Sequence, residues 1–149
     1  MEIRLAVLAD AANVTTDGKL NVTGIFNRLR TTALPAQHPL LVAVLQIAIG
    51  AADFGREAQT GLRIVAPDGE TTDPFTMTHK LPRGRPGEPA LWNVIFRLPN
   101  LRLAKAGAYE FHVLVDQATV ATIPLTVTKV EAKGSPPSQP PAPPKDDAP

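Results

Sequence analysis

Apolar and polar residues alternate with a period of two along most of the first 130 residues. This alternation is typical of β-strands that bury one face on a sheet. The clearest runs are Trp92–Leu98, Tyr109–Val115 and Ala121–Val127, each with an apolar residue at every second position. In the first run, the face that carries Trp92 is predicted to be core. No stretch of roughly 11 residues follows a helical period, so the chain is predicted to be all-β.

Turn signals separate these runs. The pair Asp17-Gly18 stands between β-prone residues and predicts a hairpin whose two turn residues both adopt positive φ. Asp116-Gln117 is the predicted turn of a closing hairpin. Gly24, inside the second predicted strand, indicates a bulge or a close backbone approach. Gly107 and Tyr109 stand where many sandwich domains have a tyrosine whose hydroxyl bonds upstream backbone at a corner.

These strands and turns predict the fold class. About seven or eight strands with frequent turns favour an antiparallel two-sheet sandwich of the immunoglobulin-like kind, with a small β-barrel as the alternative. The segment Leu98–Ala106 has room for one helical turn. The other segments expected to form strands are Ile3–Ala9, with Ile3, Leu5, Val7 and Ala9 on one face, Leu20–Phe26, Leu40–Ile49, Thr60–Val65 and Thr71–Lys80.

The run Leu40–Ile49 is apolar on both faces. Such a run suits a central strand covered on both sides, a strand at an interface, or a buried helical segment. Valine and isoleucine favour a strand. If one face is uncovered, it forms an apolar patch and implies a partner or a second copy of the chain. The residues proposed for this interface are Leu40, Val42, Val44 and Ala48.

Composition narrows the function classes. The formal net charge of +1 argues against a nucleic-acid-binding protein, which usually carries a basic stripe. The 149 residues include no cysteine, which excludes disulfides, thiolate metal sites and cysteine nucleophiles and favours the cytoplasm. The opening Met1–Asp10 lacks the features of a signal peptide. The longest apolar run is about half the length that spans a bilayer, so no membrane association is expected.

The composition changes at Lys133, where a proline-rich segment begins. We therefore expect a folded domain over residues 1–132 and a disordered tail over residues 133–149. The stretch Pro140–Lys145 matches the PxxPx+ pattern, which in an animal protein would suggest an SH3-domain ligand, but proline-rich tails are common and the pattern favours a solubilising spacer. The sequence leaves the partner of this tail open.

No catalytic, cofactor or metal constellation emerges from the residues. His38, His79 and His112 are far apart in the sequence and lack metal-ligand spacing, so no metal site is expected. Carboxylates are scattered, and the first serine is Ser135, which removes serine-hydrolase chemistry from the folded part. The expectation leans away from an enzyme.

The segment Ala9–Phe26, which reads ADAANVTTDGKLNVTGIF, resembles the opening of a family of small uncharacterised bacterial all-β proteins, a domain of unknown function. His38-Pro39 and the segment Gly107–Phe111 extend the resemblance over about residues 1–130. It implies a bacterial source and an all-β fold, and it implies no activity. The family often has Asp-Gly at the closing turn, where this chain has Gln117.

Asp10, Asn13 and Asn21 within this opening are the candidate site residues. Their side chains can organise a bend by bonding nearby backbone N–H groups. Alternatively, they line a polar pocket at one end of the sandwich. The main functional hypothesis is a non-catalytic binding or protein-interaction module. The alternatives are a small-ligand protein or enzyme that uses Asp10 and Asn13, and a structural component of a larger assembly.

Overall fold

The structure, a computed structural model, describes residues 1–72 and 75–132. Within these residues it contains no α-helix, one 3-10 turn (Ala51–Asp53) and no helix long and apolar enough to cross a membrane. The strands are β1 (Glu2–Val14), β2 (Leu20–Phe26), β3 (Arg28–Thr31), β4 (Ala36–Ile49), β5 (Glu57–Val65), β6 (Phe75–Lys80), β7 (Ala90–Leu103), β8 (Gly107–Val115) and β9 (Ala118–Lys129).

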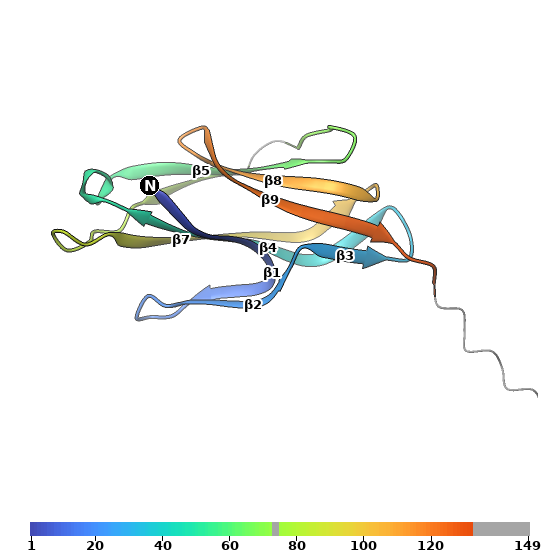
Figure 1. The fold of residues 1–149 in the computed structure, drawn as a ribbon, viewed down its shortest axis with the longest axis horizontal. Helices are drawn as coiled ribbons and strands as arrows, with labels where there is room; N and C mark the ends of the chain where they lie inside the picture. Colours follow the sequence, from blue (N-terminus) through green and yellow to red (C-terminus); the bar gives the residue numbers. More distant parts are fainter. Residues whose placement is uncertain (73–74, 133–149) are drawn as a thin grey trace, which may run out of the picture.

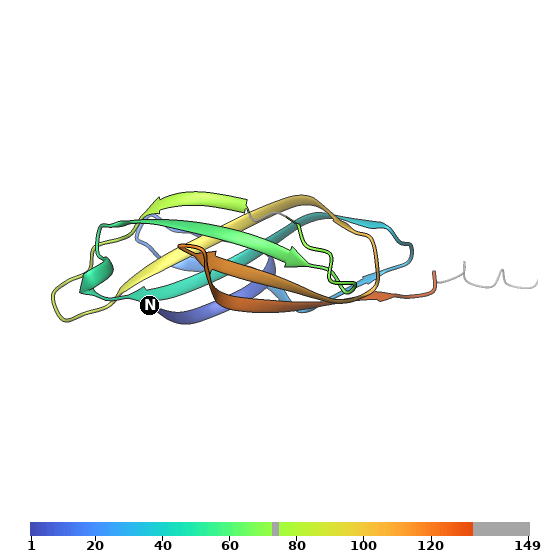
Figure 2. The same ribbon diagram turned by 90° about the horizontal axis from the view of Figure 1, so that it is seen from above.

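The strands form two sheets packed face to face (Figures 1 and 2). Sheet A has the order β2-β1-β4-β7, and sheet B has the order β3-β9-β8-β5-β6. Neighbouring strands run antiparallel, except that β3 runs parallel to β9. The prediction of an all-β two-sheet sandwich is confirmed.

The strand order is immunoglobulin-like. The run β1-β4-β7 of sheet A corresponds to strands A, B and E of that fold, and β9-β8-β5-β6 corresponds to G, F, C and C′. In the common sandwich a further strand, D, pairs with E at the sheet edge. Among the described residues nothing pairs with the outer edge of β7, so this position is empty.

The core lies between the sheets and follows the predicted alternation. The inward faces of β7 and β8 carry the predicted core residues, all of them buried, from Trp92 to Leu98 and from Tyr109 to Val115. The Tyr109 hydroxyl donates a hydrogen bond to the Lys105 carbonyl oxygen (2.6 Å) and accepts one from the Lys105 N–H (3.2 Å). The expected tyrosine corner is therefore present.

The phase of the first strand differs from the prediction. Ile3, Leu5, Val7 and Ala9 were expected on one face, but the register shifts between Ile3 and Leu5. This irregularity reverses the faces beyond it, so Leu8 points into the main core whereas Ala9 belongs to a second cluster. Sequence alternation cannot reveal such a shift, because both faces of this strand carry apolar residues.

That second cluster lies on the outer face of sheet A, where the β1–β2 hairpin covers β4 (Figure 1). Val42 and Val44 are 1% and 0% exposed, and Ala12 and Val22 of the hairpin pack against their cluster. The Arg97 guanidinium on β7 also donates a hydrogen bond to the Ala12 carbonyl oxygen (3.1 Å). Of the interpretations open for this run, the structure selects a central strand covered on both faces.

Gly24 provides the close approach that the hairpin requires. It adopts φ +70 opposite Asp10, and a Cβ at this position would lie 3.1 Å from the Asp10 Cβ and closer still to its carboxylate. A side chain at residue 24 would therefore collide with Asp10. Of the two possibilities that the sequence left open at Gly24, a bulge and a close approach, the structure shows the close approach.

The two hairpin turns depart from expectation in opposite ways. In the first, only Gly18 has positive φ, and the Thr15 N–H bonds the Lys19 carbonyl oxygen (2.8 Å). The loop is therefore longer than the predicted two-residue turn. In the closing hairpin, Asp116 and Gln117 both have positive φ, at 48° and 70°. This turn keeps two left-handed residues although it lacks glycine.

Two further elements differ from the prediction. The structure adds β3, a four-residue strand that pairs with β9, nearly a hundred residues away in sequence. It also extends β7 to Leu103 as strand, where a helical turn had room. The proline-rich tail predicted over residues 133–149 lies outside the described residues.

Candidate functional site

Asp10, Asn13 and Asn21, the predicted site residues, all lie exposed on the β1–β2 hairpin. Asn13 and Asn21 are cross-strand partners, and Asp10 sits opposite Gly24. None of the three lines the hollows described below. Asp10 lies at the close approach to Gly24, and both roles, organising the bend and lining a polar pocket, stay predictions.

The four residues predicted as an interface occupy the outer face of β4. Val42, Val44 and Ala48 are 1%, 0% and 6% exposed, and only Leu40 is exposed, at 39%. The chain's own hairpin covers the centre of this face. A partner could therefore reach Leu40, but it could reach the two valines only by displacing the hairpin.

The three histidines lie in separate places. His38 packs against Phe26 (ring centroids 6.0 Å apart), and His112 Nε2 lies 2.8 Å from a Glu110 carboxylate oxygen. His79 contacts the Trp92 ring edge-on (5.6 Å). Among residues 1–72 and 75–132, no group of three or more histidine, aspartate or glutamate side chains is arranged to hold a metal ion.

The charged clusters that exist hold turns in place. Arg56 bridges Asp53 (2.7 Å) and Asp116 (2.9 Å), and an Asp116 carboxylate oxygen accepts the Gln59 N–H (3.0 Å). The Gln59 N–H, followed by the Arg56 guanidinium, lowers the pKa of Asp116. Asp116 is thereby anchored in its left-handed conformation, which explains how the closing turn forms without glycine.

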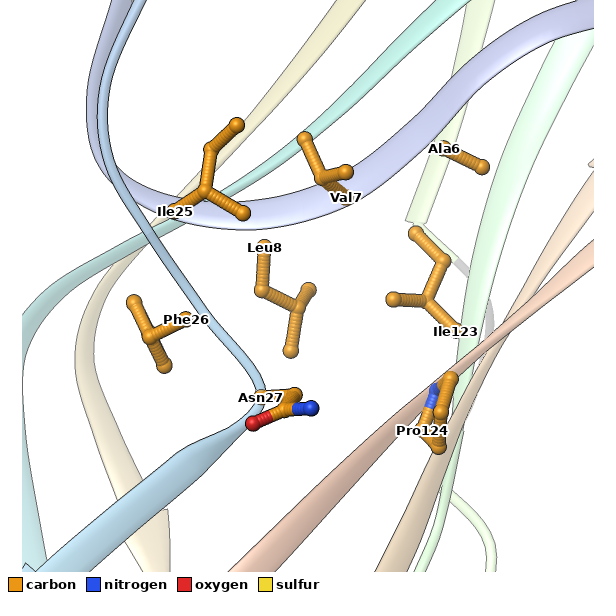
Figure 3. Close-up of a pocket in the computed structure, with 8 residues that line it drawn as sticks. All are labelled: Ala6, Val7, Leu8, Ile25, Phe26, Asn27, Ile123 and Pro124. Atoms are coloured by element: carbon orange, nitrogen blue, oxygen red, sulfur yellow. The ribbon is translucent and has the colours of Figure 1, made fainter.

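Apolar openings occur instead along the two seams where the sheets meet edge to edge. The first, the β1–β9 seam, holds a hollow of about 370 Å³. Figure 3 shows the residues around it, which come from β1, from the end of β2 and from β9. Ile25, at its rim, is 60% exposed. The lining residues are Ala6, Val7, Leu8, Ile25, Phe26, Asn27, Ile123 and Pro124.

The chain itself partly closes this seam. Asn27 is the single residue between β2 and β3, so the chain passes here directly from sheet A to sheet B. Its carbonyl oxygen accepts the Thr126 N–H (2.9 Å), which shows that Thr126 faces away from β8. Pro124, two residues earlier, faces the same way and has no N–H to offer. The free edge of β9 is thus blunted beside the hollow.

The second opening, the β6–β7 seam, lies at the opposite side of the sandwich. Its hollow, about 310 Å³, lies between Phe75 and Met77 of β6 and the segment from Ile95 to Leu98 of β7. Phe75 and Met77 are 52% and 36% exposed. Among residues 1–72 and 75–132, only Thr76 and Arg97 bring polar side chains to this hollow.

The exposure of Phe75 and Met77 follows from the strand order. Both are register partners of core residues on β5, Phe75 of Leu62 and Met77 of Thr60, and therefore lie on the inward face of sheet B. The strand that would lie beneath them belongs beyond β7, where sheet A ends. Their apolar side chains thus face a space that the described chain leaves unfilled.

The other end of β6 is anchored. The His79 ring packs on Trp92, and its Nε2 lies 2.8 Å from the Thr60 hydroxyl oxygen. Burial lowers the pKa of His79, because desolvation disfavours the charged imidazolium. The neutral ring therefore holds the end of β6 against Trp92, near the start of β7.

Neither seam is among the candidate sites predicted from the sequence. Phe75 and Met77 lie in a predicted strand, but alternation alone does not say which strands form sheet edges. No local signal distinguishes an inward residue over a neighbouring strand from one over an empty position. The strand order was needed to find it.

Comparisons with known proteins place the chain by family rather than by activity. No curated protein matches it. An alkylpurine DNA glycosylase (AlkC) from Pseudomonas fluorescens, bound to DNA with an abasic site analog, is 8% identical with a TM-score of 0.49; the match covers 85% of this chain and 30% of the glycosylase. An immunoglobulin-like protein from Pseudomonas aeruginosa is 16% identical with a TM-score of 0.37; that match covers 85% and 97%.

A family model matches residues 4–128. This match spans nearly the whole described domain and confirms the resemblance first seen in the opening motif. The chain belongs to the Family of unknown function (DUF6941).

Proposed function

We propose that this domain is a non-catalytic protein-interaction module whose contacts are made at the seams of the sandwich. The observation that carries the proposal is the distribution of exposed apolar side chains. Ile25 lines the β1–β9 seam, and Phe75 and Met77 line the β6–β7 seam. Grouped apolar side chains at a groove support a binding surface, whereas single scattered ones need no explanation.

The polar side chains support the same proposal. Enzymes place titratable groups together in a cleft, often with shifted pKa values. Here the charged groups with shifted pKa values, such as Asp116, Arg56 and Asp68, hold exposed turns. Both seam hollows are lined mainly by aliphatic and aromatic side chains.

Composition favours a protein partner in a reducing compartment such as the cytoplasm. The net charge of +1 gives little attraction to nucleic acid, and a chain without cysteine has no use for oxidising conditions. A bacterial source remains part of the proposal, because it rests on the resemblance of the opening motif.

Site-directed photocrosslinking tests the proposal. A benzophenone amino acid replaces Phe75 or Ile25 in the full chain, which is then irradiated in a native lysate. We expect discrete crosslinked products at one of these positions, and an excess of unlabelled chain should compete them away.

The matched control places the same group at Arg63, which is exposed on the outer face of sheet B. Crosslinking there should be weak and should not respond to competition. Equal crosslinking at all three positions, or none that competition removes, would contradict an interaction function at the seams.

A further inference from the structure

We propose that the β6–β7 seam binds an extended segment of a partner protein as an added strand of sheet A. The segment would have apolar residues at alternate positions and acidic residues among the others. This inference rests on the proposed function and specifies its site and the chemistry of its partner. Strand addition of this kind supplies affinity through main-chain hydrogen bonds and specificity through pockets for alternate side chains.

The outer edge of β7 can accept such a strand. β7 is the last strand of sheet A and pairs only with β4 among the described residues. Proline within a strand directs its ring nitrogen toward the free edge, so Pro99 marks the direction of that edge. Residues two and four positions earlier, Arg97 and Ile95, direct their N–H and C=O groups the same way. These groups are available to a new strand.

The hollow beside this edge fits the side chains of the added strand. A strand next to β7 would occupy the empty D position, beneath the inward face of β6. Its inward residues would cover Phe75 and Met77, which are 52% and 36% exposed in the free protein. Alternate apolar residues are therefore required, because successive side chains of a strand point to opposite faces.

The positive charges of β6 and β7 indicate which residues the bound segment carries between its apolar positions. β6 and β7 together carry Lys80, Arg97 and Arg102 and no aspartate or glutamate. Arg97 lies on the outer face of β7, where its guanidinium has one hydrogen bond, to the Ala12 carbonyl oxygen, in place. A carboxylate on the outer face of the added strand would pair with it. Complementary charges of this kind favour the encounter and fix its register.

A second copy of the chain does not fit this edge through antiparallel pairing with its own β7. β6 of the first copy already lies above the position that the second β7 would take. The second copy would bring its own sheet B to the same level, about 10 Å above its sheet A, and the two sheets would collide. A single extended segment without a second layer avoids this collision.

Peptide display on the full-length chain tests the inference. A library of random ten-residue peptides is selected for binding, and the enriched peptides are synthesised and measured by fluorescence anisotropy. We expect enriched sequences with alternating apolar residues and a net negative charge. Methylation of alternate backbone nitrogens, which removes the hydrogen-bond donors of a strand, should weaken binding at least about tenfold.

Three variants locate the site. The double substitution Phe75→Thr/Met77→Thr keeps β propensity but removes the apolar surface, and should also weaken binding at least about tenfold. Ile95→Pro removes one free-edge donor, and should weaken binding without loss of the folded signal in circular dichroism. Val14→Thr, at an exposed position outside both seams, is the matched control and should leave the affinity unchanged, whereas Ile25→Thr reports on the other seam.

Each other outcome overturns a defined part of the account. Enriched peptides that Ile25→Thr weakens, and that Phe75→Thr/Met77→Thr leaves unaffected, would move the site to the β1–β9 seam and leave the interaction function standing. Peptides whose binding tolerates backbone methylation would exclude strand addition. Failure to enrich any peptide would count against the proposed function as well as its site.

Discussion

An edge strand borders each of the two seams of the sandwich, and the chain covers the exposed edge at only one of them. At the β1–β9 seam, the chain crosses between the sheets at Asn27, β3 pairs with β9, and Pro124 blunts the remaining edge. At the β6–β7 seam, no strand of the described residues lies beyond β7 in sheet A, and Phe75 and Met77 stay exposed. Both seams have hollows of similar size.

The uncovered edge of β7 is the part of the sandwich where a function is to be sought. Edge strands are a liability that proteins usually cover or blunt. Two additions cover the first side: the β1–β2 hairpin, which carries the opening segment of the family resemblance, and β3, which follows that segment directly. A long edge left uncovered on the other side is therefore a feature that needs an explanation, and a binding role supplies one.

The largest change in the free energy of unfolding is expected for a substitution in the β1–β2 hairpin, on the covered side. Gly24→Ala should lower the free energy of unfolding by about 3 kcal/mol, because it combines left-handed strain with a collision against Asp10. Gly69→Ala is the matched control, since Gly69 also has positive φ (86°) but open space around it. It should cost about 1 kcal/mol. Urea denaturation of both variants measures the difference.

A double variant separates the two contributions. Asp10→Ala should restore much of the stability lost by Gly24→Ala, because it removes the carboxylate that the new Cβ meets. If the two substitutions are simply additive, the close approach between Asp10 and Gly24 does not explain the bend of the hairpin.

The next largest effect on stability is expected when one apolar side chain is shortened beneath the hairpin and another at the open seam. Val44→Ala, beneath the hairpin, should lower the free energy of unfolding by about 2 kcal/mol, since the side chain is fully buried. Met77→Ala, at the open seam, should cost about 1 kcal/mol or less, because Met77 is 36% exposed. Thermal denaturation compares them. Equal losses would mean that the two sides are covered equally.

Acidification should loosen the open side. Burial lowers the pKa of His79 in the folded protein below its unfolded value of about 6.5. The stabilisation from the neutral ring is therefore present above about pH 6.5 and is lost as the pH falls through the folded pKa. Unfolding at about pH 7 and about pH 5 should show a loss that His79→Gln reduces.

The matched control for this pH effect is His112→Gln. His112 lies on the outward face of β8 beside Glu110, away from both seams. This variant should keep most of the pH dependence attributed to His79. Identical pH profiles for the wild type and His79→Gln would remove the anchoring role assigned to His79.

The smallest effect on stability is expected for a substitution in the closing turn, outside both seams. Gln117 has φ 70°, where glycine carries no steric penalty, so Gln117→Gly should raise the free energy of unfolding by about 0.5–1 kcal/mol. The same substitution should leave peptide binding at the β6–β7 seam unchanged. Destabilisation would show that the Gln117 side chain makes a contact that the turn geometry does not reveal.

Much of the fold could be predicted from local pattern. The alternation at Trp92–Leu98 and Tyr109–Val115 identified the two strands whose inward faces form much of the core. Tyr109 signalled its corner, and Gly24 signalled a close approach. These predictions succeeded because the relevant physics lies within a few residues or a single turn.

The remainder depends on contacts that are distant in sequence. β3 is only four residues long, and its pairing with β9 cannot be inferred from its own residues. The hairpin's return over Val42 and Val44 follows from a bend whose direction no local pattern encodes. The open seam likewise became visible only when β7 proved to be the last strand of its sheet.

Residue-resolved amide hydrogen exchange of the full chain tests the central claim most directly. If the outer edge of β7 is free, the N–H groups of Ile95 and Arg97 should exchange fast, while those of Val94 and Phe96, directed at β4, should be strongly protected. The Thr126 N–H, bonded to Asn27, should be protected as the internal reference. Equal protection along Val94–Arg97 would contradict the account, because it would mean that the edge is already occupied.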